Sequence, residues 1–286
     1  MKLLEAIKKG ASFLEEKGVD SARLNVELLL EHILKTPRLQ LYMDFERELT
    51  ETQTDELRQA IKRRGNREPL QHIIGSTEFC GLEIEVSKSV LIPRPETESL
   101  AELAIRHLEQ SKGLKILEIG TGSGCLPISI VHKTADTQAV SIDVSSEALE
   151  VAQRNVDHHD LGSRIQLIHG DALELLSEQK GFDLLVTNPP YIPAADIETL
   201  DPEVRDHDPR LALDGGPDGL DFYRHLASHA AGSLTSEGCL MAEYGDGQGP
   251  AIQSLFEEHG WKDVRLSKDF TDRDRFVIAS APSING

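Results

Sequence analysis

The chain has little of what disulfide-linked, metal-binding or membrane-spanning proteins require. Its 286 residues include only three cysteines, Cys80, Cys125 and Cys239, and their spacing matches no metal-ligand pattern. An odd set of cysteines indicates free thiols in a reducing compartment, and we expect no metal site. No stretch approaches the ~20 apolar residues of a membrane span. Met1 to Gly10 also lacks the apolar run of a signal peptide, so we expect a cytoplasmic protein.

Positive charge is scarce, and the shortage lies in one part of the chain. The net charge is −19, from 30 Lys and Arg against 49 Asp and Glu. Residues 1–75 contain 13 of each sign, so the rest of the chain carries the whole imbalance. Because nucleic-acid binding relies on Lys and Arg that neutralise phosphates, an acidic surface disfavours DNA or RNA as a substrate. It favours a basic protein segment as the partner.

Periodicity divides the chain into a helical part and an α/β part. Apolar residues recur at helical spacing from Leu3 to Leu14, from Leu24 to Ile33 and from Leu57 to Ile61, which predicts a small all-α domain over residues 1–75. Alternating apolar residues after Thr77 predict a β-hairpin linker over residues 76–95. Strand and helix patterns alternate over residues 96–286, which predicts a seven-stranded, mostly parallel sheet with a late antiparallel hairpin.

One basic cluster, formed by Lys62, Arg63, Arg64 and Arg67, closes the helical part. Lys and Arg at the end of a helix complement its dipole, so a solvated helix end is one interpretation. A contact with ribosomal RNA is the other.

A glycine loop follows the first predicted strand of the α/β part. The segment Lys115 to Ile119 reads as a buried strand. In the loop that follows it, glycines alternate with other residues and do not follow the G-x-G-x-x-G pattern of dinucleotide binding. Alternate glycines allow a sharp turn and a close approach to a ligand, and an acid before them suits a positively charged ligand such as S-adenosylmethionine. The cofactor-binding candidates here are Glu118, Gly120, Thr121, Gly122, Ser123 and Gly124.

Two further acids follow the next two strands. Asp143 ends a strand about 20 residues past the glycine loop, where a carboxylate that binds ribose hydroxyls is expected. It can also be a helix N-cap, a role that Ser145 fits equally well. Asp171 follows the third strand and is a candidate acceptor for an adenine amino group, with Ala172 lining the ring, although Asp171 can equally be a plain loop residue.

The tetrapeptide Asn188-Pro189-Pro190-Tyr191 follows the fourth strand and carries the strongest functional signal. The Asn188 side-chain oxygen and the Pro189 carbonyl can each accept one hydrogen of a planar amino group. Tyr191 can provide an apolar wall beside that group. Asn188 is also a candidate to border the cofactor. Ligands of open α/β sheets bind at the carboxyl ends of the strands, so we expect all four motifs to face one crevice.

The chain resembles the N5-glutamine methyltransferases that modify the GGQ motif of peptide-chain release factors. The resemblance rests on Pro69 to Gly75, Ile92 to Glu98, Asp208 to Gly216 and Asp218 to Leu220, besides the glycine loop and the Asn188 tetrapeptide. It implies a Rossmann-like class I methyltransferase domain over residues 96–286, preceded by a release-factor-binding helical domain. It also implies S-adenosylmethionine as cofactor, with residues 120–124, Asp143 and Ala172 around it and Asn188 to Tyr191 holding the glutamine. We expect a monomer that binds neither DNA nor membranes.

Some segments allow more than one interpretation. Arg94, Thr97 and Glu98 either shape the pocket or belong to a stiff linker in which Thr97 caps a helix beginning near Glu98. Thr271-Asp272 departs from the family pattern in a hairpin that we expect to lie far from the chemistry. Three other activities stay open, namely methylation of a glutamine in a large-subunit ribosomal protein, methylation of a nucleic-acid adenine, and cofactor binding without catalysis.

Overall fold

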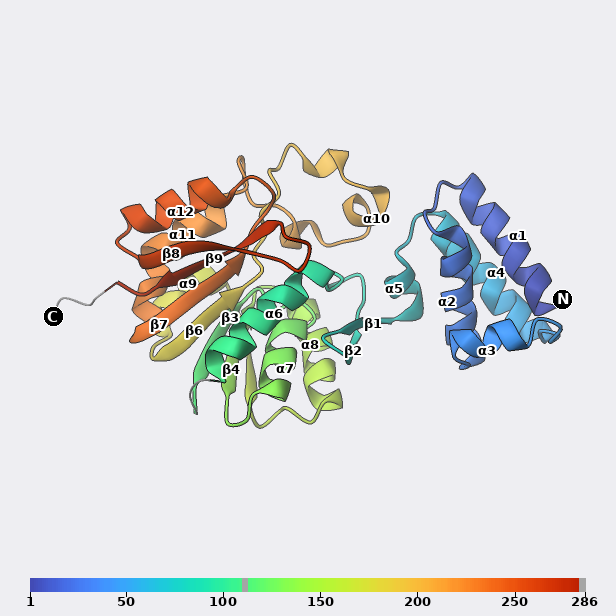
Figure 1. Cartoon of the computed structure of the whole chain (residues 1–286), viewed down its shortest axis with the longest axis horizontal. Helices are drawn as coiled ribbons and strands as arrows, with labels where there is room; N and C mark the ends of the chain where they lie inside the picture. Colours follow the sequence, from blue (N-terminus) through green and yellow to red (C-terminus); the bar gives the residue numbers. More distant parts are fainter. Residues whose placement is uncertain (110–112, 283–286) are drawn as a thin grey trace. The chain divides into compact units, whose positions relative to one another are not determined.

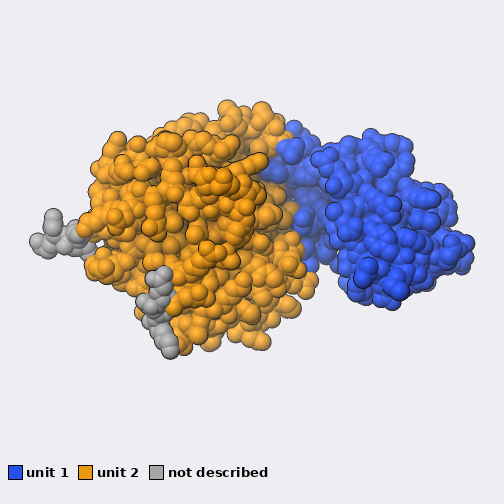
Figure 2. Space-filling model, viewed as in Figure 1, with its two compact units in different colours: residues 1–76, 201–207 blue, residues 77–200, 208–286 orange. Residues whose placement is uncertain are grey.

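The computed structural model describes residues 1–109 and 113–282 and divides the chain into two compact units. Unit 1 consists of Met1–Ser76 together with Asp201–His207. Unit 2 consists of Thr77–Leu200 and Asp208–Gly286 (Figure 2). A short segment that follows the Asn188 tetrapeptide in sequence therefore belongs to the helical unit.

Unit 1 is all helical, as the periodicity predicts. Thr50 and Gln53 form a capping box at the start of α4, each side chain bonding the other's backbone nitrogen. Apolar side chains from α1, α2 and α4 pack into one buried core. The helices are α1 (Leu3–Glu16), α2 (Ala22–Leu34), α3 (Arg38–Met43), α4 (Glu51–Gly65), α5 (Leu70–Ile74) and α10 (Pro202–Arg205).

The basic cluster at the end of α4 is used inside unit 1. Arg64 is only 7% exposed, and its guanidinium donates to Asn25 at 2.8 Å and to Glu203 of α10 at 2.9 Å. Arg67 donates to the same Glu203 carboxylate at 2.6 Å, and Arg63 donates to Glu68 at 2.7 Å. The interpretation of Arg64 as part of a solvated helix end is wrong, and these paired guanidinium groups lend no support to an RNA contact.

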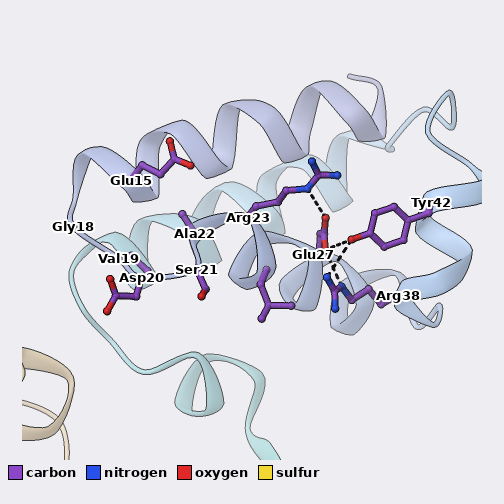
Figure 3. A pocket seen from close by; sticks show the side chains of 11 residues that line it. Glu15, Gly18, Val19, Asp20, Ser21, Ala22, Arg23, Glu27, Arg38 and Tyr42 are labelled. Carbon is purple, nitrogen blue, oxygen red and sulfur yellow. Dashed lines mark hydrogen bonds and ion pairs between the residues drawn. The ribbon is translucent and has the colours of Figure 1, made fainter.

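A hollow of about 650 Å³ in unit 1 lies beside a buried carboxylate on α2. The Glu27 carboxylate accepts from Arg23 and Arg38 at 2.8 Å and from the Tyr42 hydroxyl at 2.6 Å (Figure 3). Burial raises the pKa of Glu27, but the three donors outweigh burial, and the pKa lies below its ordinary value. None of the residues predicted for the cofactor or the glutamine lines this hollow.

Unit 2 is built on a seven-stranded sheet with the order β5-β4-β3-β6-β7-β9-β8 (Figure 1). The first five of these strands run parallel, and β9 pairs antiparallel with both β7 and β8. This is the predicted mostly parallel sheet with a late hairpin. The strands are β3 (Lys115–Ile119), β4 (Gln138–Asp143), β5 (Ile165–His169), β6 (Phe182–Thr187), β7 (Leu234–Glu243), β8 (Lys262–Lys268) and β9 (Asp274–Ser280).

Helices cover both faces of the sheet because successive strand residues point to opposite faces. Ile116 and Leu184 pack in one core with α6, α7 and α8. Leu117 and Leu185 pack in the other core with α11 and α12. The helices of unit 2 are α6 (Pro95–Leu108), α7 (Cys125–Lys133), α8 (Ser146–His158), α9 (Ala172–Leu175), α11 (Asp221–His229) and α12 (Gly249–Glu258).

A short hairpin, β1 (Ser76–Phe79) and β2 (Leu82–Glu85), stands in the predicted linker. Its two-residue turn has positive φ at Cys80 (52°) and Gly81 (80°), as a tight hairpin turn requires. The Asn155 side chain on α8 accepts from the Glu85 backbone nitrogen at 2.7 Å and donates to the Ser123 carbonyl at 2.8 Å. The hairpin is thereby joined to the glycine loop. Among the described residues, no helix has the length and apolar character to cross a membrane.

Candidate active site

The four predicted motifs follow β3, β4, β5 and β6 at the carboxyl ends of parallel strands. The strand order reverses between β3 and β6, because the chain moves from β3 to β4 and β5 on one side before it returns to β6 on the other. Ligands of open α/β sheets bind at such a reversal. Ile119 and Thr187 are the last paired residues of β3 and β6, so the glycine loop and the Asn188 tetrapeptide leave the sheet side by side at this position.

Positive φ explains the alternate glycines of the loop after β3. Gly120, Gly122 and Gly124 have φ of 72°, 53° and 79°, values that side chains disfavour. A Cβ added at Gly120 or Gly122 would meet no atom within 4 Å, whereas one at Gly124 would lie 3.3 Å from the Ala152 Cβ. The first two glycines therefore border open space where a ligand can approach the backbone, and the third packs against α8.

Asp143 lies at the end of β4 and reaches the glycine loop. Its carboxylate accepts from the Gly122 backbone nitrogen and from the Ser145 backbone nitrogen, each at 2.9 Å. The N-cap of α8 is Ser145, whose hydroxyl accepts from the Ala148 nitrogen at 3.1 Å. The N-cap interpretation of Asp143 is therefore wrong. Each oxygen has a second lone pair with which to accept from a hydroxyl.

Glu118 is a buried acid directly below the glycine loop. It is 2% exposed, and the Thr121 hydroxyl donates to it at 2.5 Å. Burial raises the pKa of Glu118 to about 7, with the Thr121 hydrogen bond acting against it. Burial makes the ionised form of Glu118 costly, and a cation bound at the glycine loop would stabilise that ionised form.

The acid after β5 has a local structural role. Asp171 is the exposed N-cap of α9, and its side chain accepts from the Leu173 backbone nitrogen at 2.9 Å. Ala172 is buried. Asp171 is therefore a helix cap rather than a plain loop residue. Its bond to an adenine amino group stays a prediction.

Asn188 is held by its nitrogen, which leaves its oxygen available. The Asn188 Nδ2 donates to the Thr97 hydroxyl at 3.1 Å. In the part of the chain that the structure describes, no group donates to the Asn188 Oδ1 or to the Pro189 carbonyl. These are the two acceptors that the sequence predicts for a planar amino group.

Thr97 belongs to a hydrogen-bonded chain that ends on a buried glutamate. Helix α6 begins at Pro95, so the interpretation of Thr97 as a cap for a helix starting near Glu98 is wrong. The Thr97 hydroxyl donates to Glu243 Oε2 at 2.7 Å, and the Tyr191 hydroxyl donates to Glu243 Oε1 at 3.3 Å. Burial raises the pKa of Glu243 to about 7, and it also raises the pKa of Tyr191.

Backbone packing around the tetrapeptide explains the glycines of the segment after Asp208. A Cβ at Gly215 would lie 2.8 Å from the Tyr191 Cα, and one at Gly219 would lie 2.3 Å from the Tyr191 carbonyl. The Ile192 nitrogen donates to the Leu213 carbonyl at 3.0 Å. The tetrapeptide is thus closely packed against residues 213–219, which belong to the segments on which the resemblance rests.

Arg94 and Glu98 have structural partners. Arg94 forms an ion pair at 2.5 Å with Asp208, whose side chain is 1% exposed. The pair joins two of the segments that carry the family resemblance, Ile92 to Glu98 and Asp208 to Gly216. Glu98 accepts from the Cys80 backbone nitrogen at 2.8 Å and fixes the turn of the β1–β2 hairpin. The Phe270 nitrogen donates to the Ser99 hydroxyl at 3.2 Å, so the last hairpin contacts α6 two residues beyond Thr97. Phe276 of β9 also pairs with Glu243, whose side chain accepts from Thr97 and Tyr191, so the expectation that this hairpin lies far from the site is wrong.

Sequence reasoning missed Glu243 and Gln248. Glu243 is the last residue of β7, and an acid at the end of a buried strand is the same signal that identified Asp143. Gln248 lies five residues later. It accepts from the nearby Gly245 nitrogen and donates to the Tyr191 and Gly219 carbonyls of distant loops, which no local pattern indicates. Among residues 1–109 and 113–282, no group of acids, histidines and cysteines is arranged to hold a metal ion.

Comparison with known proteins matches both parts of the chain. The PrmC N-terminal domain matches residues 5–75, and the methyltransferase small domain matches residues 96–200. A release factor glutamine methyltransferase from Geobacter sulfurreducens is 43% identical over 265 residues, which cover 93% of this chain and 92% of that protein. One from Chlorobaculum tepidum is 39% identical, with 98% and 97% covered. The solved structure of a methyltransferase from Pyrococcus furiosus aligns at 19% identity with a TM-score of 0.53, over 71% of this chain and 90% of that one, and supports the fold.

Proposed function

Because the chain belongs to the release factor glutamine methyltransferases, we propose that it methylates the side-chain nitrogen N5 of the glutamine in the GGQ motif of peptide-chain release factors. The methyl donor of this class of enzymes is S-adenosyl-L-methionine. The single observation that supports the substrate most directly is the pair of acceptors at Asn188 and Pro189. They suit the two hydrogens of a primary carboxamide.

The tetrapeptide acts as a clamp on the substrate amide. The Asn188 Oδ1 and the Pro189 carbonyl each accept one amide hydrogen, which holds the nitrogen so that its face is presented for reaction. Tyr191 and Pro190 border the planar group. An amide nitrogen is a poor nucleophile because its lone pair is delocalised, so alignment and electrostatic stabilisation contribute most of the rate enhancement.

The same acceptors stabilise the transition state. As the N–C bond forms, the bond between the methyl group and the donor sulfur breaks and leaves a neutral thioether. The amide nitrogen becomes cationic and its hydrogens more acidic, so their bonds to Asn188 and Pro189 strengthen. The methylated nitrogen then loses one proton to water, because an N-protonated amide is a strong acid. No Asp or His is needed as a general base in this scheme.

The residues around the glycine loop fit the proposed cofactor. S-adenosyl-L-methionine, when bound, supplies an electrophilic methyl group on a cationic sulfur. Gly120 and Gly122 border open space, and the Asp143 carboxylate bonds the Gly122 nitrogen. Glu118 is a buried acid whose ionised form a bound cation would stabilise. Ala172, Asp171 and Asn188 complete the set that we assign to cofactor binding, together with Thr121, Ser123 and Gly124 of the loop.

We assign partner binding and chemistry to different parts of the chain. Residues 1–75 form the helical domain that engages the release factor, residues 76–95 the hairpin linker and residues 96–286 the methyltransferase domain. The acidic charge of the methyltransferase domain favours a basic protein loop over DNA as the substrate. We further propose that the enzyme is cytoplasmic, since release factors act on ribosomes. We also propose that it is a monomer.

Methyl transfer from labelled cofactor to purified substrates tests this function. Release factor, large-subunit ribosomal proteins, DNA and RNA are offered separately under identical conditions. We expect label on the release factor alone, at the GGQ glutamine. Label on a ribosomal protein or on nucleic acid instead would show that the substrate assignment is wrong, and cofactor binding without transfer to any of them would identify a non-catalytic module.

A further inference from the structure

We propose that Thr97 and Glu243 are positioning residues that determine which end of the Asn188 side-chain amide faces the substrate. The inference rests on the proposed function, because the orientation matters only if Asn188 accepts a hydrogen from the glutamine. A side-chain amide has an oxygen at one end and an NH2 group at the other, with nearly the same shape. Something in the protein must therefore select one orientation.

The selection follows from hydrogen-bond polarity. An ionised carboxylate can only accept, and a hydroxyl has a single hydrogen to donate. The Thr97 hydroxyl lies 2.7 Å from Glu243 Oε2, so its hydrogen points to that oxygen. A lone pair of the Thr97 oxygen is then left for the Asn188 Nδ2, which lies 3.1 Å away. With its NH2 group held in this way, Asn188 presents Oδ1 to the substrate.

The same carboxylate also holds the other end of the tetrapeptide. Glu243 Oε1 accepts from the Tyr191 hydroxyl at 3.3 Å, while Oε2 is linked to Asn188 through Thr97. The Tyr223 hydroxyl donates to the Glu243 backbone carbonyl and anchors the end of β7. Glu243 is 1% exposed and Thr97 is 4% exposed, so water does not readily replace either partner. One buried side chain on β7 thus organises both polar ends of the motif that follows β6.

Loss of the acceptor would reverse the polarity of the chain of bonds. If Glu243 became a donor, the Thr97 hydrogen would be free to point at Asn188. The amide would then turn its oxygen inward and its NH2 outward. The NH2 group of the substrate amide would then face the NH2 group of Asn188 instead of its oxygen. The hydrogens of both groups would lack an acceptor there.

Protonation of Glu243 is one way in which this reversal can occur. Burial and, to a smaller extent, Glu96 on α6 raise the pKa of Glu243, while Thr97, Tyr191 and Arg275 on β9 lower it, and the net pKa is about 7. The carboxylate that sets the polarity is therefore present above about pH 7 and is lost as the pH falls. We expect the methylation rate at saturating substrates to rise with pH through this range.

The experiment compares four variants with the wild type in single-turnover methylation of a release factor. Thr97→Val removes the hydroxyl at nearly constant shape, Thr97→Ser keeps it, and Glu243→Gln replaces the acceptor-only group by an amide. Thr134→Val is the matched control, because Thr134 is another buried threonine whose hydroxyl bonds a backbone carbonyl, that of Ile130, at 2.7 Å. Cofactor affinity by calorimetry and thermal unfolding are measured alongside.

We expect Thr97→Val to lower the rate about tenfold or more, as the loss of one buried hydrogen bond predicts, with cofactor affinity changed less than about twofold. Thr97→Ser and Thr134→Val should stay near the wild type, and Glu243→Gln should be slow and lack the rise of rate with pH. If Thr97→Val does not fold, the pH profile of Glu243→Gln decides the question.

Several results would overturn the inference alone. They are a wild-type rate for Thr97→Val, an equal loss in Thr134→Val, or an unchanged pH profile in Glu243→Gln, each in a background where the wild type methylates the release factor. A wild type that methylates no release factor would instead remove the proposed function, and this inference with it.

Discussion

The side-chain amide of Gln248 lies 2.9 Å from the Tyr191 carbonyl and donates to it from Nε2. The same nitrogen lies 3.4 Å from the Gly219 carbonyl, and the Gln248 oxygen accepts from the Gly245 nitrogen at 2.9 Å. One side chain at the start of α12 therefore joins three loops at their backbones. The last residue of the proposed substrate clamp is held in place through this amide.

Gln248→Ala should lower the methylation rate while leaving cofactor affinity nearly unchanged. The substitution leaves the Tyr191 and Gly219 carbonyls without their donor, and each lost bond costs about 1 kcal/mol or more. Single-turnover kinetics and calorimetry separate the two effects. Gln253→Ala on the same helix is the control, because Gln253 bonds Glu257 and the Val264 carbonyl rather than the tetrapeptide. Equal effects from both variants would contradict a specific role for Gln248.

Gly215→Ala should displace the tetrapeptide by steric contact. The added Cβ would lie 2.8 Å from the Tyr191 Cα and 2.9 Å from both the Gly219 Cα and the Pro190 carbonyl. These are backbone atoms that cannot rotate away, so we expect a loss of about 1 to 3 kcal/mol in urea unfolding and a slower reaction. Gly162→Ala, which meets only one side-chain atom at 3.9 Å, should change neither quantity. A fully active and stable Gly215→Ala protein would argue against this packing.

Arg94→Ala should destabilise the protein more at about pH 8 than at about pH 5. Burial raises the pKa of Asp208 to about 6, although Arg94 lowers it, so the carboxylate costs stability where it is ionised. Removal of Arg94 raises the pKa of Asp208 further. At about pH 8 the buried Asp208 side chain must then either stay charged without its partner or take up a proton, a cost that is largely absent at about pH 5, where Asp208 is mostly protonated. Arg94→Ala with Asp208→Asn should recover much of the loss. Urea unfolding at both pH values measures this.

The control for that prediction is Arg224→Ala. Arg224 pairs with Asp218 and Asp221, and all three side chains are about half exposed. Exposed pairs contribute about 1 kcal/mol or less, so this variant should lose little stability at either pH. An Arg94→Ala loss that is the same at both pH values would show that Asp208 is not the source of the effect.

Cofactor binding should strengthen as the pH rises through about 7. Burial raises the pKa of Glu118 to about 7, and the Glu118 anion, which a cationic ligand favours, is scarce below that pH. Calorimetry with S-adenosylmethionine at about pH 6 and pH 7.5 should show tighter binding at the higher value. Glu118→Gln should bind more weakly and show a smaller dependence on pH. A dependence that persists unchanged in Glu118→Gln would assign it to another group.

The sheet and the order of the site motifs were predictable because their signals are local. The strands that end at the crevice are rich in apolar residues. A glycine follows β3 and β5, Asp143 ends β4, and the Asn188 tetrapeptide follows β6. The resemblance, which rests on contiguous segments, is confirmed by relatives that are alike over nearly the whole chain. The roles assigned to the site residues stay proposals.

The connections between distant segments were not predictable from the sequence. Thr97 and Glu243 are 146 residues apart, and no periodicity reports that they meet. The sequence suggests Thr97 as a cap because threonine is common just before a helix, whereas Pro95 already begins α6. The sequence suggests a solvated Arg64 because basic residues at a helix end are usually exposed, and no local signal indicates its partner Glu203, which is 139 residues away.

Mass spectrometry of a co-expressed release factor tests the central claim most directly. With the wild-type enzyme we expect a mass gain of one methyl group on the GGQ glutamine. Asn188→Ala removes one of the two acceptors for the substrate amide, and a charge-assisted bond contributes about 2 kcal/mol or more, so the modification should be lost or slowed by orders of magnitude. A fully methylated glutamine with Asn188→Ala, or an unmodified one with the wild type, would contradict the account.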